Sequence, residues 1–143
     1  MSCAVLASAL STRAAIGTPE ETAEPCHANF TVSGGRLSGY SFKAFANFPA
    51  VAPARAFSSL ARAIAADGAT LQNTNEKLGT FSALNALGPN MAGSRPVNAL
   101  VTPEQSGARV ELSWSIAPFI AFHKGDVETR FCKWLGRVGL DPK

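Results

Sequence analysis

The residues best suited to metal binding or nucleophilic catalysis are few and poorly spaced. Cys26 and His27 are adjacent, but the only other histidine is His123, and a zinc site needs three or four protein ligands. Neither Cys-x-x-Cys nor His-Glu-x-x-His occurs in the chain. Ser38 and Ser94 lie beside glycines, but neither fits the Gly-x-Ser-x-Gly pattern of a nucleophile elbow. We therefore predict no catalytic residue, no metal site and no cofactor.

The most polar central stretch is "TNEKLG", residues 74–79. It separates two apolar segments and ends in Gly79, which can adopt the positive φ that a tight turn requires. Glu76 in this stretch and Glu111 are the acids of the region of alternating apolar residues that we consider for catalysis. A catalytic carboxylate pair is one interpretation, but a solvated turn and strand face fit the pattern better.

The chain has three cysteines, Cys3, Cys26 and Cys132. Cys26 and Cys132 stand at the two ends of the region with periodic apolar residues, so an exported domain could join them in a disulfide. The alternative is a pair of buried reduced thiols. Only the first interpretation indicates an oxidising compartment.

The N-terminal segment "MSCAVLASALSTRAAIG" is apolar and rich in small residues, as in a signal peptide, but it has no basic region before the apolar stretch. Residues 17–28 contain two prolines and three glutamates and are typical of a linker. We expect residues 1–28 to be a targeting remnant or flexible segment and residues 29–143 to be one domain. No apolar run reaches the ~18 residues of a transmembrane span.

The charged residues argue against nucleic-acid binding. The 143 residues carry a formal net charge of +3, and the bases are scattered singly rather than interleaved with aromatic residues in a patch. A mildly basic, ordinary protein surface explains this distribution.

The elements that would position any site follow from periodicity. Residues 40–48 alternate between apolar and polar and predict a strand that ends at Pro49. Residues 52–68 predict a helix with Pro53 in its first turn, Gly68 after its end and an apolar stripe that includes Phe57, Leu60 and Ile64.

Further strands are expected at residues 70–75, 80–87, 97–102 and 108–116, and a second amphipathic helix at residues 125–139. The order β-α-β-β-β-β-α predicts a two-layer α+β domain, in which an antiparallel sheet of four to five strands is covered on one face by two helices.

Three segments give this order a family resemblance: "FPA" at the end of the first strand, the helix "ARAFSSLARAIAADG" and the following "LQNTNEKLGTFSA". They resemble small bacterial envelope domains of helix-grip type, such as the BamC family of outer-membrane lipoproteins. The resemblance covers roughly residues 40–138 and implies an exported, non-enzymatic accessory or binding domain. It transfers no catalytic residue, and the chain shows no intact lipoprotein signal.

Six aromatic residues are the candidates for ligand or partner contact. Five could line a cleft between helices and sheet, or could simply fill the core: Phe45, Phe48, Phe57, Trp114 and Phe131. Trp134 lies beside the apolar stripe of its helix; it could belong to the core, or it could be half exposed and line a groove or a partner surface.

These patterns leave three functional hypotheses. The first is a periplasmic or secreted non-enzymatic domain that contacts another envelope protein. The second is a binder of a small apolar molecule in the cleft, and the third is a small cytosolic enzyme.

Overall fold

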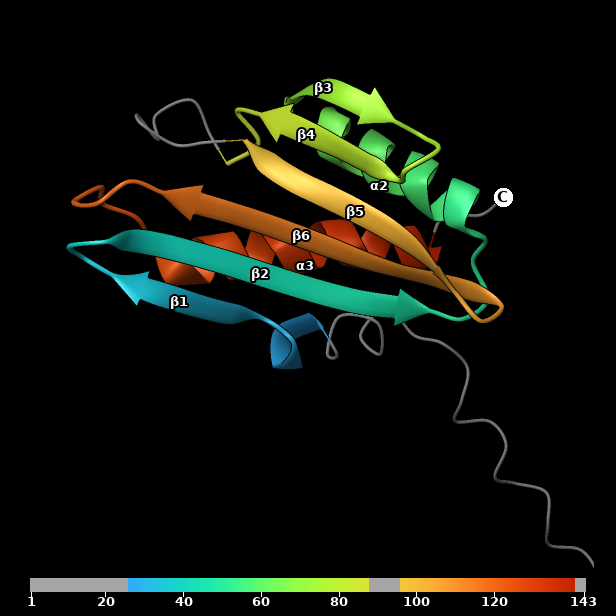
Figure 1. Ribbon diagram of the computed structural model, residues 1–143, viewed down its shortest axis with the longest axis horizontal. Coiled ribbons are helices and arrows are strands. Elements are labelled where there is room, and N and C mark those ends of the chain that lie inside the picture. Colours follow the sequence, from blue (N-terminus) through green and yellow to red (C-terminus); the bar gives the residue numbers. More distant parts are fainter. Residues whose placement is uncertain (1–25, 88–95, 141–143) are drawn as a thin grey trace, which may run out of the picture.

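The computed structural model describes residues 26–87 and 96–140. This part of the chain forms one six-stranded antiparallel sheet with two long helices on one of its faces (Figure 1). The strands are β1 (Thr31–Gly35), β2 (Gly39–Phe48), β3 (Thr70–Asn75), β4 (Thr80–Leu84), β5 (Val97–Glu104) and β6 (Gly107–Ile116), and the helices are α2 (Pro53–Ala66) and α3 (Lys124–Leu140). Across the sheet the strand order is β1-β2-β6-β5-β4-β3.

The two longest strands of the sheet, β2 and β6, are neighbours. Each strand has ten residues, and they pair in register from Tyr40 opposite Ile116 to Phe48 opposite Ala108. Alternate side chains point to the helices and are buried, as the period of two predicts. Phe42 and Trp114 face each other across this pair, with ring centroids 5.4 Å apart.

The helices cover these inward side chains. The stripe of α2 is buried at Phe57, Leu60 and Ile64, and the helix packs against β3, β5 and β6. Helix α3 packs against β2 and against α2. Burial of these apolar stripes supplies most of the helical stability, since isolated helices of this length are marginal in water.

The predicted α+β class, the antiparallel sheet and both long helices are confirmed, but the number of strands is wrong. The sixth strand is β1, a segment whose sequence indicates a short apolar piece followed by a glycine-rich turn. It shows no alternation because Val32 is its only large apolar residue and because Gly34 takes a φ of 99°. It nevertheless pairs with the free edge of β2.

A second correction concerns residues 26–28, which the sequence indicates as linker and which form a short helical turn. Most of the proposed targeting segment and linker, and most of the loop at 88–96, lie outside the described residues. In the part of the chain that the structure describes, no helix is both long enough and apolar enough to cross a membrane.

Candidate functional site

The candidate aromatic residues do not form one site. Five of the six lie between the sheet and the helices, each at most 5% exposed: Phe48, Phe57, Trp114, Phe131 and Trp134. They pack on other core rings, for example Phe57 edge-on to Phe81 at 5.4 Å between centroids. In this structure they fill the core, as the simpler interpretation of the sequence holds.

Phe45 is wrongly placed among the cleft residues. It occupies an outward position of β2, between the buried residues Ala44 and Ala46, so its ring lies on the face of the sheet that the helices leave open. The alternation of β2 requires this, because successive strand residues point to opposite faces.

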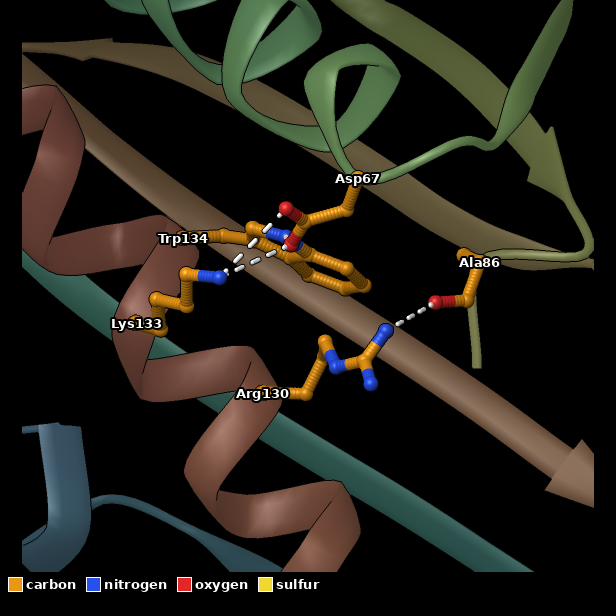
Figure 2. Close-up of polar contacts among 5 residues, drawn as sticks. All are labelled: Asp67, Ala86, Arg130, Lys133 and Trp134. Carbon is orange, nitrogen blue, oxygen red and sulfur yellow. Dashed lines mark hydrogen bonds and ion pairs between the residues drawn. The ribbon is translucent and has the colours of Figure 1, made fainter. Parts of the chain in front are cut away.

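Trp134 is fully buried, so that of the two alternatives for this residue the position in the core is the one that the structure has. Figure 2 shows why a polar indole can be buried there: its Nε1–H donates to Oδ2 of Asp67 at 2.7 Å. Asp67 caps the C-terminus of α2, and Lys133 on α3 lies 3.3 Å from the same oxygen. Arg130 on α3 donates to the carbonyl oxygen of Ala86 at 3.0 Å.

These contacts also set the charge state of Asp67. Burial alone would raise the pKa of its carboxyl group, but the hydrogen bonds from Trp134 and Lys133 and the positive charges of Lys133 and Arg130 outweigh burial, so that its pKa lies below the ordinary value. An ionised acceptor with two donors suits a structural role. The cluster ties α3 to α2 and to the end of β4.

Cys26 and Cys132 are joined in a disulfide, with Cα atoms 5.6 Å apart. Both residues are buried, and the bond fastens the helical turn at 26–28 to α3. Cys26 is therefore not available as a metal ligand. Its neighbour His27 instead contacts Glu128 at 2.8 Å on the surface, and no cluster of three possible metal ligands occurs among residues 26–87 and 96–140.

The most extensive feature with potential for binding is the helix-free face, which we define by the outward residues of all six strands. One row of opposed residues crosses the entire sheet and carries a single charge: Thr31, Lys43, Ser113, Asn98, Ser82 and Gln72. Within this row the Ser82 hydroxyl and the Asn98 side-chain oxygen lie 2.7 Å apart.

The neighbouring row is mixed in character: Phe45, Glu111, Leu100, Thr80 and Asn75. A shallow depression of about 410 Å³ lies over both rows, between Lys43 on β2 and Asn73 on β3. Leu100 lies in it and is 37% exposed. The depression can accept hydrogen-bonding groups along one side and an apolar group along the other.

Phe45 on β2 contacts a basic side chain of the neighbouring strand β6. The guanidinium carbon of Arg109 lies 3.8 Å from the centroid of the Phe45 ring, and its Nη2 lies 3.2 Å from Oε2 of Glu111. A cation over an aromatic ring is attracted by the ring's negative face. Phe45, Arg109 and Glu111 thus form an ordered aromatic and charged cluster on the helix-free face.

The sequence itself contains a signal for this face. In residues 97–102 the buried side chains are Val97, Ala99 and Val101, so the alternation places the large apolar Leu100 on the solvent side. The same holds for Phe45 in β2. A single exposed apolar residue is ordinary on a protein surface, but Phe45 and Leu100 lie in one outward row on either side of Glu111, which makes this face the candidate for binding.

No protein-family model matches the sequence, and no curated protein is significantly similar to it. Among solved structures, the fold is similar to that of a conserved protein of unknown function, EF2215 from Enterococcus faecalis. The TM-score is 0.56, the sequence identity is 9%, and the match covers 86% of this chain and 82% of that chain. At this identity the likeness shows the fold alone.

Proposed function

We propose that this chain is an exported, non-enzymatic binding domain that holds a protein partner of the cell envelope on its helix-free face. The observation that carries the proposal is the depression over β2 to β6, with Leu100 in it and the Phe45 ring beside it. Protein interfaces are rich in aromatic residues and arginine and poor in lysine and acids at their centre. Phe45 and Arg109 supply the aromatic residue and the arginine on the helix-free face, whereas Lys43 and Glu111 on the same face depart from this composition.

The disulfide supports the export part of the proposal. Disulfides form and persist in oxidising compartments, while cytosolic thiols are kept reduced. A bond between two buried cysteines that are 106 residues apart in the sequence suits the periplasm or the outside of the cell.

The other two hypotheses lack such support. Of the five rings proposed to line a cleft for an apolar molecule, Phe45 lies on the outer face of the sheet and the other four are buried in the core, where Phe57 contacts Phe81 and Phe131 contacts Trp134. The Asp67 carboxylate, which has a perturbed pKa, is engaged by Trp134 and Lys133. We therefore propose neither a ligand in the core nor a reaction.

Site-specific photo-crosslinking in the native host tests the proposal. A photoreactive phenylalanine is placed at Leu100 on the helix-free face or, as the control, at Ala65, which is exposed on α2. We expect one discrete protein adduct from position 100 and not from position 65. Identical adducts from both positions, or none from position 100, would contradict the proposal.

A matched pair of substitutions provides a second test. Leu100→Arg should abolish binding of the captured partner in a purified system, because it puts a charge into the apolar side of the depression. Ala65→Arg should leave binding unchanged. A partner that binds both variants equally does not use the helix-free face.

A further inference from the structure

One end of the molecule carries large apolar side chains in water. Leu37, in the turn between β1 and β2, is 77% exposed, and Phe119, in the loop after β6, is 67% exposed. The two segments are joined, since the Phe119 amide donates to the carbonyl oxygen of Arg36 at 3.2 Å. Figure 1 shows the β1–β2 turn and the start of the β6–α3 connection at the same end of the sheet.

The loop that holds Phe119 is otherwise anchored in the protein. Phe122 packs edge-on against Tyr40 and Phe42, at 4.8 and 5.1 Å between ring centroids. Phe119 instead points outward and has a φ of 65°, a left-handed conformation that is uncommon for a bulky residue. An aromatic side chain that is exposed and stands on an unfavourable backbone conformation contributes little to the stability of the fold, which points to a role in binding.

The two segments that carry these side chains contain bases and no acid. Residues 36–40 and 117–125 contain Arg36 and Lys124, as well as His123, and no acid. Arg36 and Lys124 are both exposed. The first acid is Asp126, in the first turn of α3. Apolar side chains that project beside bases are the composition of protein surfaces that lie on anionic lipid bilayers.

We propose that this end, defined by Leu37, Phe119, Arg36 and Lys124, docks on a membrane surface that contains anionic lipids. Leu37 and Phe119 enter the boundary between headgroups and acyl chains, and Arg36 and Lys124 contact the headgroups. Two separate turns project here instead of a flat patch, which suits insertion into a fluid surface better than packing on a protein. The helix-free face remains free, so the proposal does not depend on the protein partner proposed above.

Vesicle flotation with the full 143-residue chain tests the inference. The vesicles contain either phosphatidylcholine alone or phosphatidylcholine with phosphatidylglycerol. We expect binding to the anionic vesicles, weaker binding at high salt and little binding to the neutral ones, because the headgroup contacts are screened. The double variant Leu37→Ser and Phe119→Asn should bind at least about tenfold more weakly. Asparagine tolerates a positive φ, so this variant keeps its fold.

Leu78→Ser is the matched control. Leu78 is also 67% exposed, but it lies in the turn between β3 and β4, at the opposite end of the sheet (Figure 1). This variant should bind the anionic vesicles like the wild type, and Arg36→Glu with Lys124→Glu should not bind them. The proposal is overturned if the wild type binds no vesicle, if it binds neutral and anionic vesicles equally, or if Leu78→Ser loses as much binding as the double variant.

Discussion

Loss of the Cys26–Cys132 bond should remove a large part of the stability of this domain. The cysteines are 106 residues apart. A cross-link that closes a loop of about 100 residues lowers the entropy of the unfolded chain and thereby raises the free energy of unfolding by about 4.7 kcal/mol in the chain-entropy model. A typical domain has a total of about 5–15 kcal/mol. We therefore expect the protein without the disulfide to be only marginally stable at room temperature.

The perturbation is a set of alanine substitutions, all in a Cys3→Ser background so that no other thiol is present. Cys26→Ala, Cys132→Ala and the double variant are compared with their parent by urea unfolding, followed by circular dichroism. With a slope of about 2 kcal/mol per molar urea, the midpoint should fall by about 2 M. The parent should show no free thiol in denaturant before reduction and two after it.

Additivity separates the covalent bond from simple packing. If the bond carries the stability, each single variant loses as much as the double variant, because either substitution breaks it. If the two side chains merely fill space as reduced thiols, the two single losses add up to the double loss. Additive losses, or two free thiols in the parent purified from an oxidising compartment, would refute the reasoning and with it the main support for export.

Three further outcomes follow from single side chains. Gly79→Val should destabilise the fold by about 2–3 kcal/mol in urea unfolding, because Gly79 has a φ of 75° and a Cβ there would overlap the Val101 carbonyl oxygen. The control Lys77→Ala should change the free energy of unfolding by less than about 0.5 kcal/mol. Equal stability of the two variants would contradict the turn geometry. Trp134→Phe should cost about 2 kcal/mol, because it removes the hydrogen bond to the Asp67 carboxylate, and an unchanged thermal midpoint would contradict that role. Because the folded-state pKa of Asp67 is lowered, its contribution to stability is complete above about pH 4 and is lost as the pH falls through the lowered pKa; acid unfolding of Trp134→Phe should begin at a higher pH than that of the wild type.

The secondary structure was largely readable from the sequence because each main element buries one face. The stripe of Phe57, Leu60 and Ile64 and the alternation around Trp114 report burial directly. Strand β1 was missed because it buries almost nothing and forms only on the edge that β2 offers. The sequence left the position of Trp134 open between core and surface because its partner Asp67 stands 67 residues earlier in the chain, and no local pattern reports that hydrogen bond.

The row of polar residues that crosses the helix-free face was beyond prediction for a different reason. Alternation says which residues of a strand point outward, but it does not say which strands are neighbours. Lys43 and Ser113 are opposed only because β6 inserts beside β2, and Asn98 and Ser82 join their row only through β5 and β4. The outward residues are the ones that core packing does not constrain, so their identities are free to serve binding. A row of hydroxyl and amide groups across six strands is thus a property of register, and it becomes visible only when the sheet is assembled.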